Sequence, residues 1–380
     1  MAVLRALSFS PGSATRHLMP ALQRVLDGTD SALVAAPAHN LDAAVRGLRV
    51  GEEIDDDVAL VVTTSGTTGA PKGALLTAAA LRASASATHR RLGGPGRWLL
   101  AIPAYHIAGL QVLIRSLLAG TEPVELDVSA GFDIGELPRA VSLLGPGRRY
   151  TSLVAAQLAK ALTDPAATAA LAELDAVLLG GGPAPRPVLD AAAATGVTVV
   201  RTYGMSETAG GCVYDGVPLD GVTLRVDADG RIALGGATLA KGYRNRVEPD
   251  PFQAGWFLTD DIGSVDDSGV LTVLGRVDDA ISTGGLTVLP GPVEAALFTH
   301  PAVRDCAVFG VDDDRLGQRV VAAVVVRPGS AAPTLPELRA HLARTLDITA
   351  APRELHLVAE LPRRGIGKVD RQALGRRFGQ

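Results

Sequence analysis

Thr63–Gly73 is the stretch of this sequence whose residue types and spacing most directly suggest chemistry. It reads Thr-Thr-Ser-Gly-Thr-Thr-Gly-Ala-Pro-Lys-Gly and follows the apolar run 58–62, which predicts a buried strand. Its glycines permit positive φ angles and let backbone N–H groups converge, while the hydroxyl groups add donors and Lys72 adds positive charge. These donors suit a polyphosphate, which carries several negative charges and many acceptor oxygens. The stretch therefore predicts a phosphate-binding loop.

The order of residues around Lys72 differs from that of a P-loop. A P-loop needs a glycine, four residues and then Gly-Lys-Ser/Thr at the start of a helix. Here Pro71 precedes Lys72 and Gly73 follows it, and the proline prevents a helix from starting as it does in a P-loop. Another class of phosphate-binding loop is therefore expected.

Lysine is rare in this chain, which makes each lysine informative. The chain has 36 basic residues, of which only Lys72, Lys160, Lys241 and Lys368 are lysine. A compact ammonium group on a flexible stem supports chemistry that arginine does not. Lys72 and Lys368 lie in Gly-rich stretches and are the candidates for such a role, whereas Lys160 falls on an amphipathic helix and is expected to be structural.

The loop resembles, residue for residue, the phosphate-binding loop of the adenylate-forming superfamily. This superfamily contains acyl- and aryl-CoA ligases, peptide-synthetase adenylation domains and luciferases. The resemblance extends through residues 58–370 and implies an AMP-forming acid–thiol ligase that uses ATP, Mg²⁺, CoA and a small-molecule carboxylic acid. The phosphate contacts that it implies are Thr64, Ser65, Gly66, Thr67, Thr68, Gly69 and Lys72.

A second motif would bring the metal ion and the α-phosphate contact. Tyr203-Gly-Met-Ser-Glu207 resembles the superfamily's Tyr-Gly-x-Thr-Glu. By that match, Glu207 would act in catalysis by holding Mg²⁺ together with Thr67, and Ser206 would approach the α-phosphate. A carboxylate beside the triphosphate suits a hard cation that prefers oxygen ligands. Tyr203 and Gly204 would also contact the nucleotide.

Two other stretches would hold the adenosine part of ATP. Gly180–Pro183 matches the Gly-rich loop on the adenine side, where Gly181 and Gly182 let a flat ring approach the backbone and Gly181 also borders the acid. Trp256-Phe-Leu-Thr-Asp-Asp261 resembles the superfamily's aromatic-x-x-Thr-Gly-Asp, so Asp261 would accept hydrogen bonds from both ribose hydroxyls. Arg276, in a Gly-Arg-x-Asp-Asp string, would lie near the ribose.

The last third of the chain would carry a mobile domain. Asp278 matches the superfamily's hinge position, Gly285 matches a glycine near the CoA pantetheine tunnel, and Lys368 matches the lysine that bridges the acyl carboxylate and the α-phosphate. Four residues depart from the superfamily pattern. Ser282, Pro292 and Arg364 bear mainly on the thioester step, and Asp260 bears on the backbone shape beside Asp261.

His106 and Arg115 are the residues expected to face the acid. Amino-acid-activating relatives usually place an aspartate after a phenylalanine where this chain has Tyr105-His106, so an α-amino acid is not expected. His106 would lie beside the acyl group and act in catalysis. Arg115 interrupts an otherwise apolar helix and needs either an anion or an exposed face.

The short N-terminal region and the string His-x-x-Gly-x-x-x-x-x-Arg that ends at Arg115 resemble the o-succinylbenzoate–CoA ligases of menaquinone biosynthesis. Their substrate is an aromatic dicarboxylate, whose second carboxylate Arg115 would anchor. Three alternatives stay open: a ligase of another aryl or acyl acid, an enzyme that hands the acyl group to a carrier protein, and a nucleotide-binding module without catalysis. A Rossmann dehydrogenase is disfavoured because Gly180–Pro183 lacks Gly-x-Gly-x-x-Gly.

The elements that would position these residues alternate between strand and helix. Strands are expected at 98–102, 121–126, 149–154, 176–179 and 197–201, with helices between them, and several strands end in Gly/Ser/Thr loops. In an α/β sheet such loops meet at the carboxyl ends of the strands, where ligands bind. From Val222 the pattern changes to hairpins with Asp-Gly and Ser-Gly turns. We therefore predict an α/β fold with a large domain (1–277) that includes a β-rich subdomain, and a small mobile α+β domain (278–380).

Composition supports a small-molecule enzyme. The 380 residues are 47% hydrophobic, enough for a sizeable core, and the net charge of −4 without a basic run disfavours nucleic acid as a partner. No apolar run approaches the length of a membrane span, and no signal-peptide core is seen. Two distant cysteines without metal-ligand spacing suit a reducing cytoplasm. The sequence leaves the oligomeric state open, a homodimer included.

Overall fold

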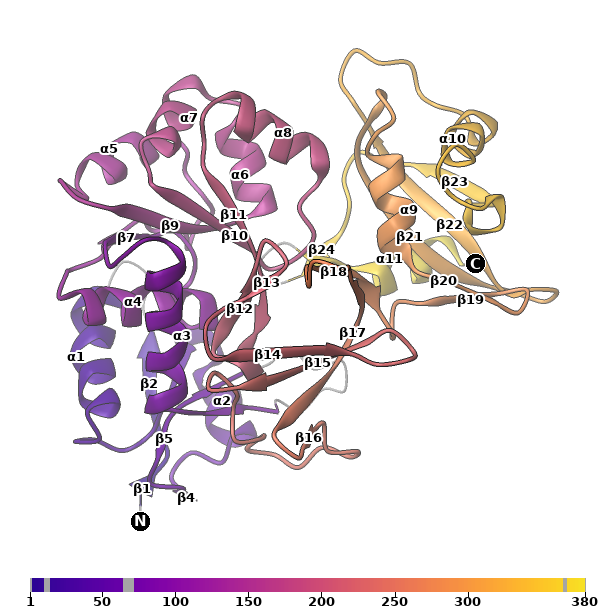
Figure 1. Ribbon diagram of the computed structural model, residues 1–380. Coiled ribbons are helices and arrows are strands. Elements are labelled where there is room, and N and C mark those ends of the chain that lie inside the picture. Colours follow the sequence, from indigo (N-terminus) through magenta and orange to yellow (C-terminus); the bar gives the residue numbers. More distant parts are fainter. Residues whose placement is uncertain (1, 10–13, 64–71, 365–367, 380) are drawn as a thin grey trace. The chain divides into compact units, whose positions relative to one another are not determined.

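The computed structural model describes residues 2–9, 14–63, 72–364 and 368–379 (Figure 1). The predicted α/β fold class is confirmed, with large N-terminal sheets and an α+β C-terminal part. The chain divides into two compact units. The first unit comprises Met1–Gly180, Ala192–Arg225 and Ala233–Thr259, and the second comprises Gly181–Ala191, Val226–Ile232 and Asp260–Gln380.

A four-stranded sheet leads into the predicted phosphate loop. Its order is β2 (Arg5–Phe9), β3 (Leu33–Pro37), β5 (Val58–Val62) and β6 (Ala74–Thr77). The first three strands are parallel and β6 runs antiparallel to β5. All five residues of β5 are buried, as an apolar run without alternation predicts. Two further strands, β1 (Ala2–Val3) and β4 (Glu53–Ile54), pair with each other.

A seven-stranded sheet forms the other half of the α/β framework, and its first five strands in chain order are parallel. Strand β12 runs antiparallel to β11, and β13 antiparallel to β12. In spatial order the strands are β13 (Val217–Pro218), β12 (Gly210–Tyr214), β11 (Val199–Met205), β10 (Ala176–Gly180), β9 (Arg149–Val154), β7 (Arg97–Leu100) and β8 (Val124–Glu125). The predicted strand at 121–126 is thus reduced to two residues.

Capping residues mark the ends of several helices that accompany these two sheets. Thr77 caps α3, because its hydroxyl accepts a hydrogen bond from the Ala80 N–H at 3.0 Å, and Gly120 ends α4 in the left-handed conformation. The helices are α1 (Ala14–Leu26), α2 (Leu41–Gly47), α3 (Ala78–Arg91), α4 (Ile107–Ala119), α5 (Leu137–Ser142), α6 (Ala155–Ala161), α7 (Pro165–Ala172) and α8 (Arg186–Ala194). Short 3₁₀ turns lie at Ala38–Asn40 and Ser206–Thr208.

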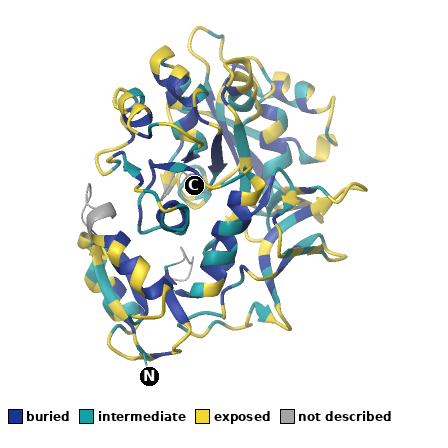
Figure 2. Ribbon diagram, turned by 60° about the vertical axis from the view of Figure 1, so that its left-hand side comes forward, coloured by how far each residue is buried: buried dark blue, intermediate teal, exposed yellow. Residues whose placement is uncertain are grey.

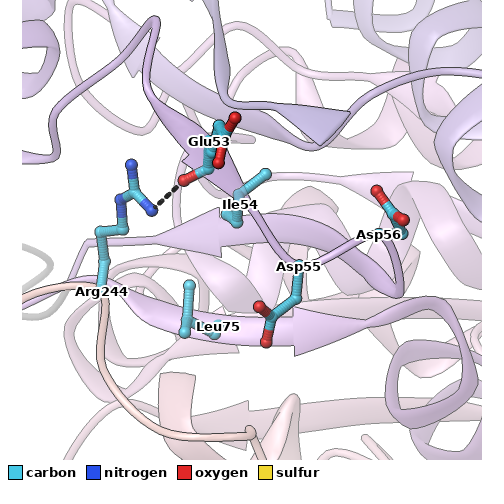
Figure 3. A pocket seen from close by; sticks show the side chains of 6 residues that line it. All are labelled: Glu53, Ile54, Asp55, Asp56, Leu75 and Arg244. Atoms are coloured by element: carbon cyan, nitrogen blue, oxygen red, sulfur yellow. Dashed lines mark hydrogen bonds between the residues drawn. The ribbon is translucent and has the colours of Figure 1, made fainter. Parts of the chain in front are cut away.

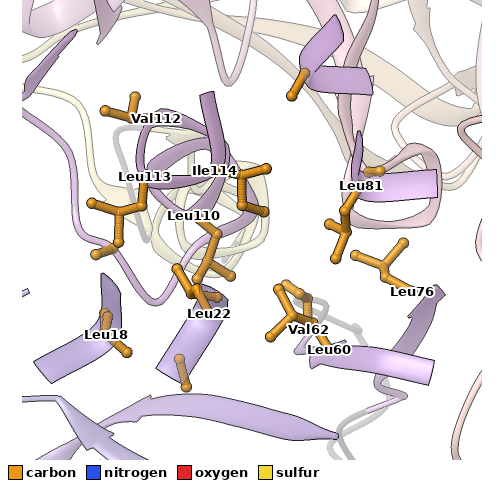
Figure 4. Close-up of a cluster of buried hydrophobic side chains, with 14 of the residues drawn as sticks. Leu18, Leu22, Leu60, Val62, Leu76, Leu81, Leu110, Val112, Leu113 and Ile114 are labelled. Carbon is orange, nitrogen blue, oxygen red and sulfur yellow. The ribbon is translucent and has the colours of Figure 1, made fainter. Parts of the chain in front are cut away.

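The main core packs helices α1, α3 and α4 against strands β5 and β6. Figure 4 shows leucine, isoleucine and valine side chains from these elements meeting in one cluster. Burial is concentrated in the interior strands and on the inner helix faces (Figure 2). Because this cluster holds the strand before the phosphate loop and the helix after it, the two ends of the loop are fixed to one rigid body.

Hairpins follow, as the Asp-Gly and Ser-Gly turns predict. The sheet has the order β14 (Val222–Val226), β15 (Arg231–Gly236), β17 (Trp256–Val265) and β16 (Phe252–Gln253), and β18 (Leu271–Arg276) pairs with β17. The pair β17–β18 places Asp261 directly opposite Arg276.

The C-terminal part is a sheet covered on both faces by helices. Alternate residues of β22 join two different cores, with Val320, Ala322 and Val324 in one and the residues between them in the other. Helices α9 and α10 pack in the first core, and α11 packs in the second. The strands are β20 (Leu286–Val288), β19 (Ile281–Thr283), β22 (Gly317–Val326), β21 (Val303–Asp313) and β23 (Glu354–Leu357).

The helices here are α9 (Pro290–Leu297), α10 (Leu335–Leu342) and α11 (Arg371–Phe378), with a 3₁₀ turn at Ile348–Ala350. A small hairpin of β24 (Arg363–Arg364) and β25 (Lys368–Val369) precedes α11. Among the described residues, no helix is both long and apolar enough to cross a membrane.

Candidate active site

Three of the predicted loops emerge at one edge of the seven-stranded sheet. Strands β7, β10 and β11 are linked through parallel pairings, so their carboxyl ends share an edge. His106 follows β7 as the N-cap of α4, the Gly180–Gly182 turn follows β10, and Tyr203 lies near the end of β11. The topology therefore brings the predicted acid-facing residue and the Tyr203–Glu207 motif to the same edge.

The Tyr203–Glu207 motif is shaped by a close backbone contact. A Cβ atom at Gly204 would lie 2.1 Å from the Gly210 carbonyl oxygen, so no other residue fits there without a backbone shift. The pairing of β11 with β12 shifts register between Tyr203 and Gly204. The chain then turns through Ser206–Thr208, and Glu207 is only 7% exposed. The backbone turn thus positions the buried Glu207 carboxylate directly after the end of strand β11.

Tyr243 connects Glu207 with the phosphate loop. Its hydroxyl donates a hydrogen bond to Glu207 Oε1 at 2.6 Å, and Lys72 Nζ lies 5.5 Å from the centre of its ring. A backbone bridge between Tyr243 and Ala74 holds it next to the strand that follows the loop. Sequence reasoning did not identify Tyr243, because its partners are far away in the chain. The only local signal is an aromatic residue within the basic run 241–246.

Of the phosphate loop itself, the structure describes Thr63, Lys72 and Gly73. A Cβ atom at Gly73 would lie 2.5 Å from a Leu48 methyl carbon, and the φ angle of Gly73, +71°, favours glycine. The last position of the loop therefore requires glycine. The other predicted phosphate contacts lie outside the described residues: Thr64, Ser65, Gly66, Thr67, Thr68 and Gly69.

The contacts of the four lysines distinguish those with a structural role from those that could bind phosphate. Lys160 donates to the Phe132 carbonyl oxygen at 2.6 Å, and Lys241 Nζ lies 2.7 Å from Asp55 and 2.8 Å from Asp57. Within the described part of the chain, neither Lys72 nor Lys368 forms an ion pair within 4 Å. The two lysines predicted to act on phosphate are therefore the two without a structural carboxylate partner there.

Arg115 is buried rather than exposed. It is 3% exposed, its guanidinium stacks 4.9 Å from the Trp98 ring, and Nη2 donates to the Tyr214 hydroxyl at 3.4 Å. Its Nε atom has no hydrogen-bond partner, and none of the described carboxylates lies within ion-pair distance. Burial lowers the pKa of Arg115, and burial together with the charge of Arg115 lowers the pKa of His89 to about 4. Of the two environments that the sequence left open for Arg115, the exposed face is excluded, and a buried cation of this kind calls for an anion.

His106 is partly exposed at the start of α4, and its ring lies 4.7 Å from that of Tyr105. Its side chain makes no helix-capping hydrogen bond, although its backbone holds the N-cap position. The N-cap position places His106 at the sheet edge that also carries Tyr203.

In the second unit, the Arg276 guanidinium lies close to three carboxylates. It pairs with Asp278 through two contacts of 2.8 Å, and it lies 3.5 Å from Asp261 and 3.5 Å from Asp260. Asp260, which replaces the superfamily glycine, also pairs with Arg231 at 2.9 Å. The extra charge at this position is thus compensated. The predicted ribose residues, Asp261 and Arg276, lie together.

Lys368 lies within electrostatic reach of Asp278. Burial would raise the pKa of Asp278, but its bonds with Arg276 outweigh burial, and the charge of Lys368 adds to them, so that the pKa is lowered. Lys368 is exposed and pairs with Arg364 across the β24–β25 hairpin. Gly285 lies in the exposed β19–β20 turn with a φ of +82° and open space where a Cβ would stand. The hinge, lysine and CoA predictions thus fall within one unit.

A hollow of about 390 Å³ lies elsewhere on the first unit (Figure 3). Its lining comprises Glu53, Ile54, Asp55, Asp56, Leu75 and Arg244. The Arg244 guanidinium is occupied by backbone carbonyl oxygens, including that of Glu53 at 2.7 Å. None of the predicted site residues lines this hollow, so it is distinct from the candidate active site.

The described residues are compatible with a magnesium ion that is bound mainly by the phosphates of a nucleotide. They contain no group of three or more His, Cys, Asp or Glu that could hold a metal. Glu207 offers one carboxylate, and Mg²⁺ is typically held by one or two carboxylates together with phosphate oxygens and water. The second predicted ligand, Thr67, lies outside the described residues.

Comparisons with known proteins agree with this arrangement. Residues 19–244 match the family model "AMP-binding enzyme", and residues 292–368 match "AMP-binding enzyme C-terminal domain". A "Probable 2-succinylbenzoate–CoA ligase" of Mycobacterium tuberculosis is 77% identical over 99% of this chain and 98% of its own length. A "2-succinylbenzoate–CoA ligase" of Geobacillus sp. is 36% identical over 84% of this chain and 69% of its own length.

A solved relative has the same fold. The o-succinylbenzoate CoA synthetase (MenE) of Bacillus subtilis, in complex with the acyl-adenylate intermediate OSB-AMP, matches 98% of this chain and 88% of its own. The TM-score is 0.76 and the sequence identity 26%. The same enzyme has been solved with ATP and a magnesium ion. The two family matches, taken with the site geometry, show that this chain belongs to the AMP-binding enzyme family.

Proposed function

We propose that the chain is an ATP-dependent carboxylate–CoA ligase that converts o-succinylbenzoate into o-succinylbenzoyl-CoA. The observation that carries this proposal is the 77% identity, along nearly the whole chain, to a protein called a probable 2-succinylbenzoate–CoA ligase. The site geometry supports the same chemistry, because two lysines that have no carboxylate partner among the described residues and a buried glutamate suit a polyphosphate substrate.

In the first half-reaction, an oxygen of the acid attacks the α-phosphorus of ATP, and the bond to the bridging oxygen breaks to release pyrophosphate. Negative charge accumulates on the phosphoryl oxygens, so fixed donors and cations stabilise the transition state. Lys72 would clamp the β- and γ-phosphates, and Glu207, oriented by Tyr243, would hold Mg²⁺. The metal, when bound, supplies charge neutralisation on the phosphate oxygens. Lys368 bridges the acid and the α-phosphate.

In the second half-reaction, the CoA thiolate attacks the acyl carbon, and the bond to AMP breaks. We propose that residues 278–380 rotate relative to residues 1–277 between the two steps, with Asp278 as the hinge. This motion would withdraw Lys368 and bring Gly285 beside the pantetheine arm. Strand β18 ends at Arg276, so Asp278 is outside the sheet ladder and its backbone torsions can change without breaking that ladder.

We propose that Arg115 anchors the second carboxylate of the acid. A dicarboxylate would supply the anion that the described residues do not. His106 is the N-cap of α4, and Arg115 lies nine residues further along the same helix, in its interior. Charge-assisted bonds to a guanidinium are strong in a buried setting. His106 would then lie beside the carboxylate that reacts.

Replacement of Arg115 by methionine tests both the substrate class and the anchor. We expect pyrophosphate exchange with o-succinylbenzoate to fall relative to exchange with benzoate, because a charged hydrogen bond is worth about 1.5–3 kcal/mol, or roughly 10- to 100-fold. A panel of acids should be measured on both proteins, with the melting temperature as the control for folding. Equal loss for both acids would contradict the anchor. Exchange by the wild type with other acids but not with o-succinylbenzoate would favour a different ligase.

Replacement of Tyr243 by phenylalanine tests the role of Glu207. The substitution removes only the hydroxyl that donates to Glu207, so the carboxylate loses its orientation. Outer-shell partners of this kind typically contribute 10- to 100-fold in metal affinity. We expect the Mg²⁺ concentration for half-maximal pyrophosphate exchange to rise by about that factor. An unchanged Mg²⁺ dependence would show that Glu207 does not act through the metal.

We also propose a cytoplasmic location. Both cysteines, Cys212 and Cys306, are buried free thiols, as is usual where thiols are kept reduced.

A further inference from the structure

Arg371 is the first residue of α11, and all three nitrogen atoms of its guanidinium form hydrogen bonds. Nη2 contacts both carboxylate oxygens of Glu294 at 2.7 and 2.9 Å, Nη1 donates to Asp279 Oδ2 at 3.0 Å, and Nε donates to the Val308 carbonyl oxygen at 3.0 Å. Glu294 is 6% exposed and also accepts from the Val308 N–H at 2.8 Å. These bonds fix the planar guanidinium of Arg371 in one orientation, and a lysine could not form the same set of bonds.

These partners come from segments with different roles. Glu294 lies in α9 and Val308 in β21, so both belong to the folded body of the C-terminal part. Asp279 is the residue directly after the proposed hinge at Asp278. Arg371 itself stands three residues after Lys368. One guanidinium therefore joins the segment after the hinge, the folded body of the C-terminal part and the start of α11, two residues after the strand that carries Lys368.

The connection from Arg371 to Lys368 is short and hydrogen-bonded. Asp370 caps α11 by accepting from the Ala373 N–H at 2.9 Å, and its own N–H donates to the Pro362 carbonyl oxygen at 2.8 Å. Lys368 is held to Arg364 by the β24–β25 pairing. The start of α11 and the hairpin with Lys368 thus move as one piece, and Arg371 fixes that piece to the segment after the hinge.

We propose that Arg371 is a positioning residue that, through Asp279, couples the segment after the hinge to Lys368. This inference rests on the proposed function, since it assumes that Lys368 acts in adenylation and is withdrawn when the domain rotates. A rigid link holds Lys368 at one defined position relative to the hinge segment while adenylation takes place. Without it, Lys368 would reach the α-phosphate in a range of positions, and small misplacements of a catalytic group slow reactions steeply.

Asp279→Asn is the sharpest test, because it weakens only the link to the hinge segment. The Glu294 pair and the Val308 bond remain, so the fold of the C-terminal part should be kept. We expect adenylation to slow by roughly tenfold in single turnover, the range of coupling through such networks. The KM for ATP and the rate of CoA attack on preformed acyl-adenylate should stay unchanged. Arg371→Lys keeps the charge but also loses the fork that contacts Glu294 and Val308, so it should slow adenylation at least as much, and its melting temperature is compared with that of the wild type.

A double-mutant cycle separates positioning from general structural damage. In a Lys368→Ala background, Asp279→Asn should cause no further loss, because there is no lysine left to position. Multiplicative losses would overturn the proposal, and so would an equal slowing of the thiol step.

Hydrogen exchange of residues 361–378 provides a readout that does not depend on activity. Asp279→Asn should raise exchange in this segment relative to the wild type, and unchanged exchange would overturn the coupling. If the wild type showed no pyrophosphate exchange with any acid, the proposed function would fail. The hydrogen-exchange comparison would still decide whether Asp279 and Arg371 hold the segment with Lys368.

Discussion

Replacement of Lys368 by alanine is expected to slow adenylation by about 10²–10³-fold, the effect of removing one preorganised donor that stabilises developing charge. The attack of CoA on preformed acyl-adenylate should proceed at nearly the wild-type rate, because Lys368 is withdrawn from the site in that step. Pyrophosphate release in single turnover measures the first step, and thioester formation from synthetic acyl-adenylate measures the second.

Lys241→Ala is a matched control for this experiment. Lys241 is an ammonium group engaged by Asp55 and Asp57, so its removal disturbs a surface ion-pair cluster without touching the proposed chemistry. Both half-reactions should remain close to wild type in this variant. Equal losses in the two half-reactions of Lys368→Ala would refute its assignment to adenylation.

Replacement of Asp278 by proline should separate the two half-reactions in the opposite sense. Proline fixes φ near −65°, which restricts the rotation proposed at this residue. Adenylation should be spared, while thioester formation should slow by roughly tenfold or more, because the C-terminal domain cannot reach its second orientation. Stopped-flow measurement of AMP release after CoA is added to preformed enzyme-bound adenylate would report this step.

The control is Asp278→Ala, because proline also removes the carboxylate that pairs with Arg276 at 2.8 Å. Alanine removes that ion pair and leaves the backbone free, so the difference between the two variants isolates the hinge. Since the pKa of Asp278 is lowered, the ion pair contributes stability above the ordinary carboxyl pKa. That contribution is lost only as pH falls through the lowered value, so assays at neutral pH compare fully ionised enzymes. An unaffected overall rate in Asp278→Pro would refute the hinge.

Local sequence signals predicted the elements that carry the site. Val58–Val62 and Arg149–Val154 are strands with the predicted bounds. Thr77 and Gly120 mark helix ends. The Thr77 hydroxyl accepts a hydrogen bond from a backbone N–H at the start of α3, and Gly120 adopts the left-handed conformation that ends α4. Such signals lie within a few residues of the structure that they determine, so they can be found without knowledge of the fold.

Elements that depend on distant partners were missed or given the wrong length. Strands β2 and β3 in the first 55 residues were not predicted, since their short mixed segments become strands by pairing in parallel with each other and with β5. The strand predicted at 121–126 has only two paired residues, because β8 is an edge strand that meets β7 over Val124–Glu125. Long-range pairing decides both cases.

The same distinction applies to the site. The motifs around Glu207, Asp261 and Lys368 are local strings that could be matched directly, whereas Tyr243 and Arg371 act through partners 36 and 77 residues away. The environment of Arg115 was open in the sequence, because an arginine on an apolar helix can point to water or to an anion. The structure answers this point, since the guanidinium is buried against Trp98 and Tyr214.

The most direct test of the central claim is a coupled measurement of AMP and CoA-thioester formation by the wild-type enzyme, with o-succinylbenzoate compared with benzoate and a fatty acid. We predict that AMP and thioester form in equal amounts with o-succinylbenzoate, at a rate well above that with the other acids, and only when ATP, Mg²⁺ and CoA are present. AMP without CoA thioester would favour transfer to a carrier protein. The absence of AMP with every acid would contradict the account.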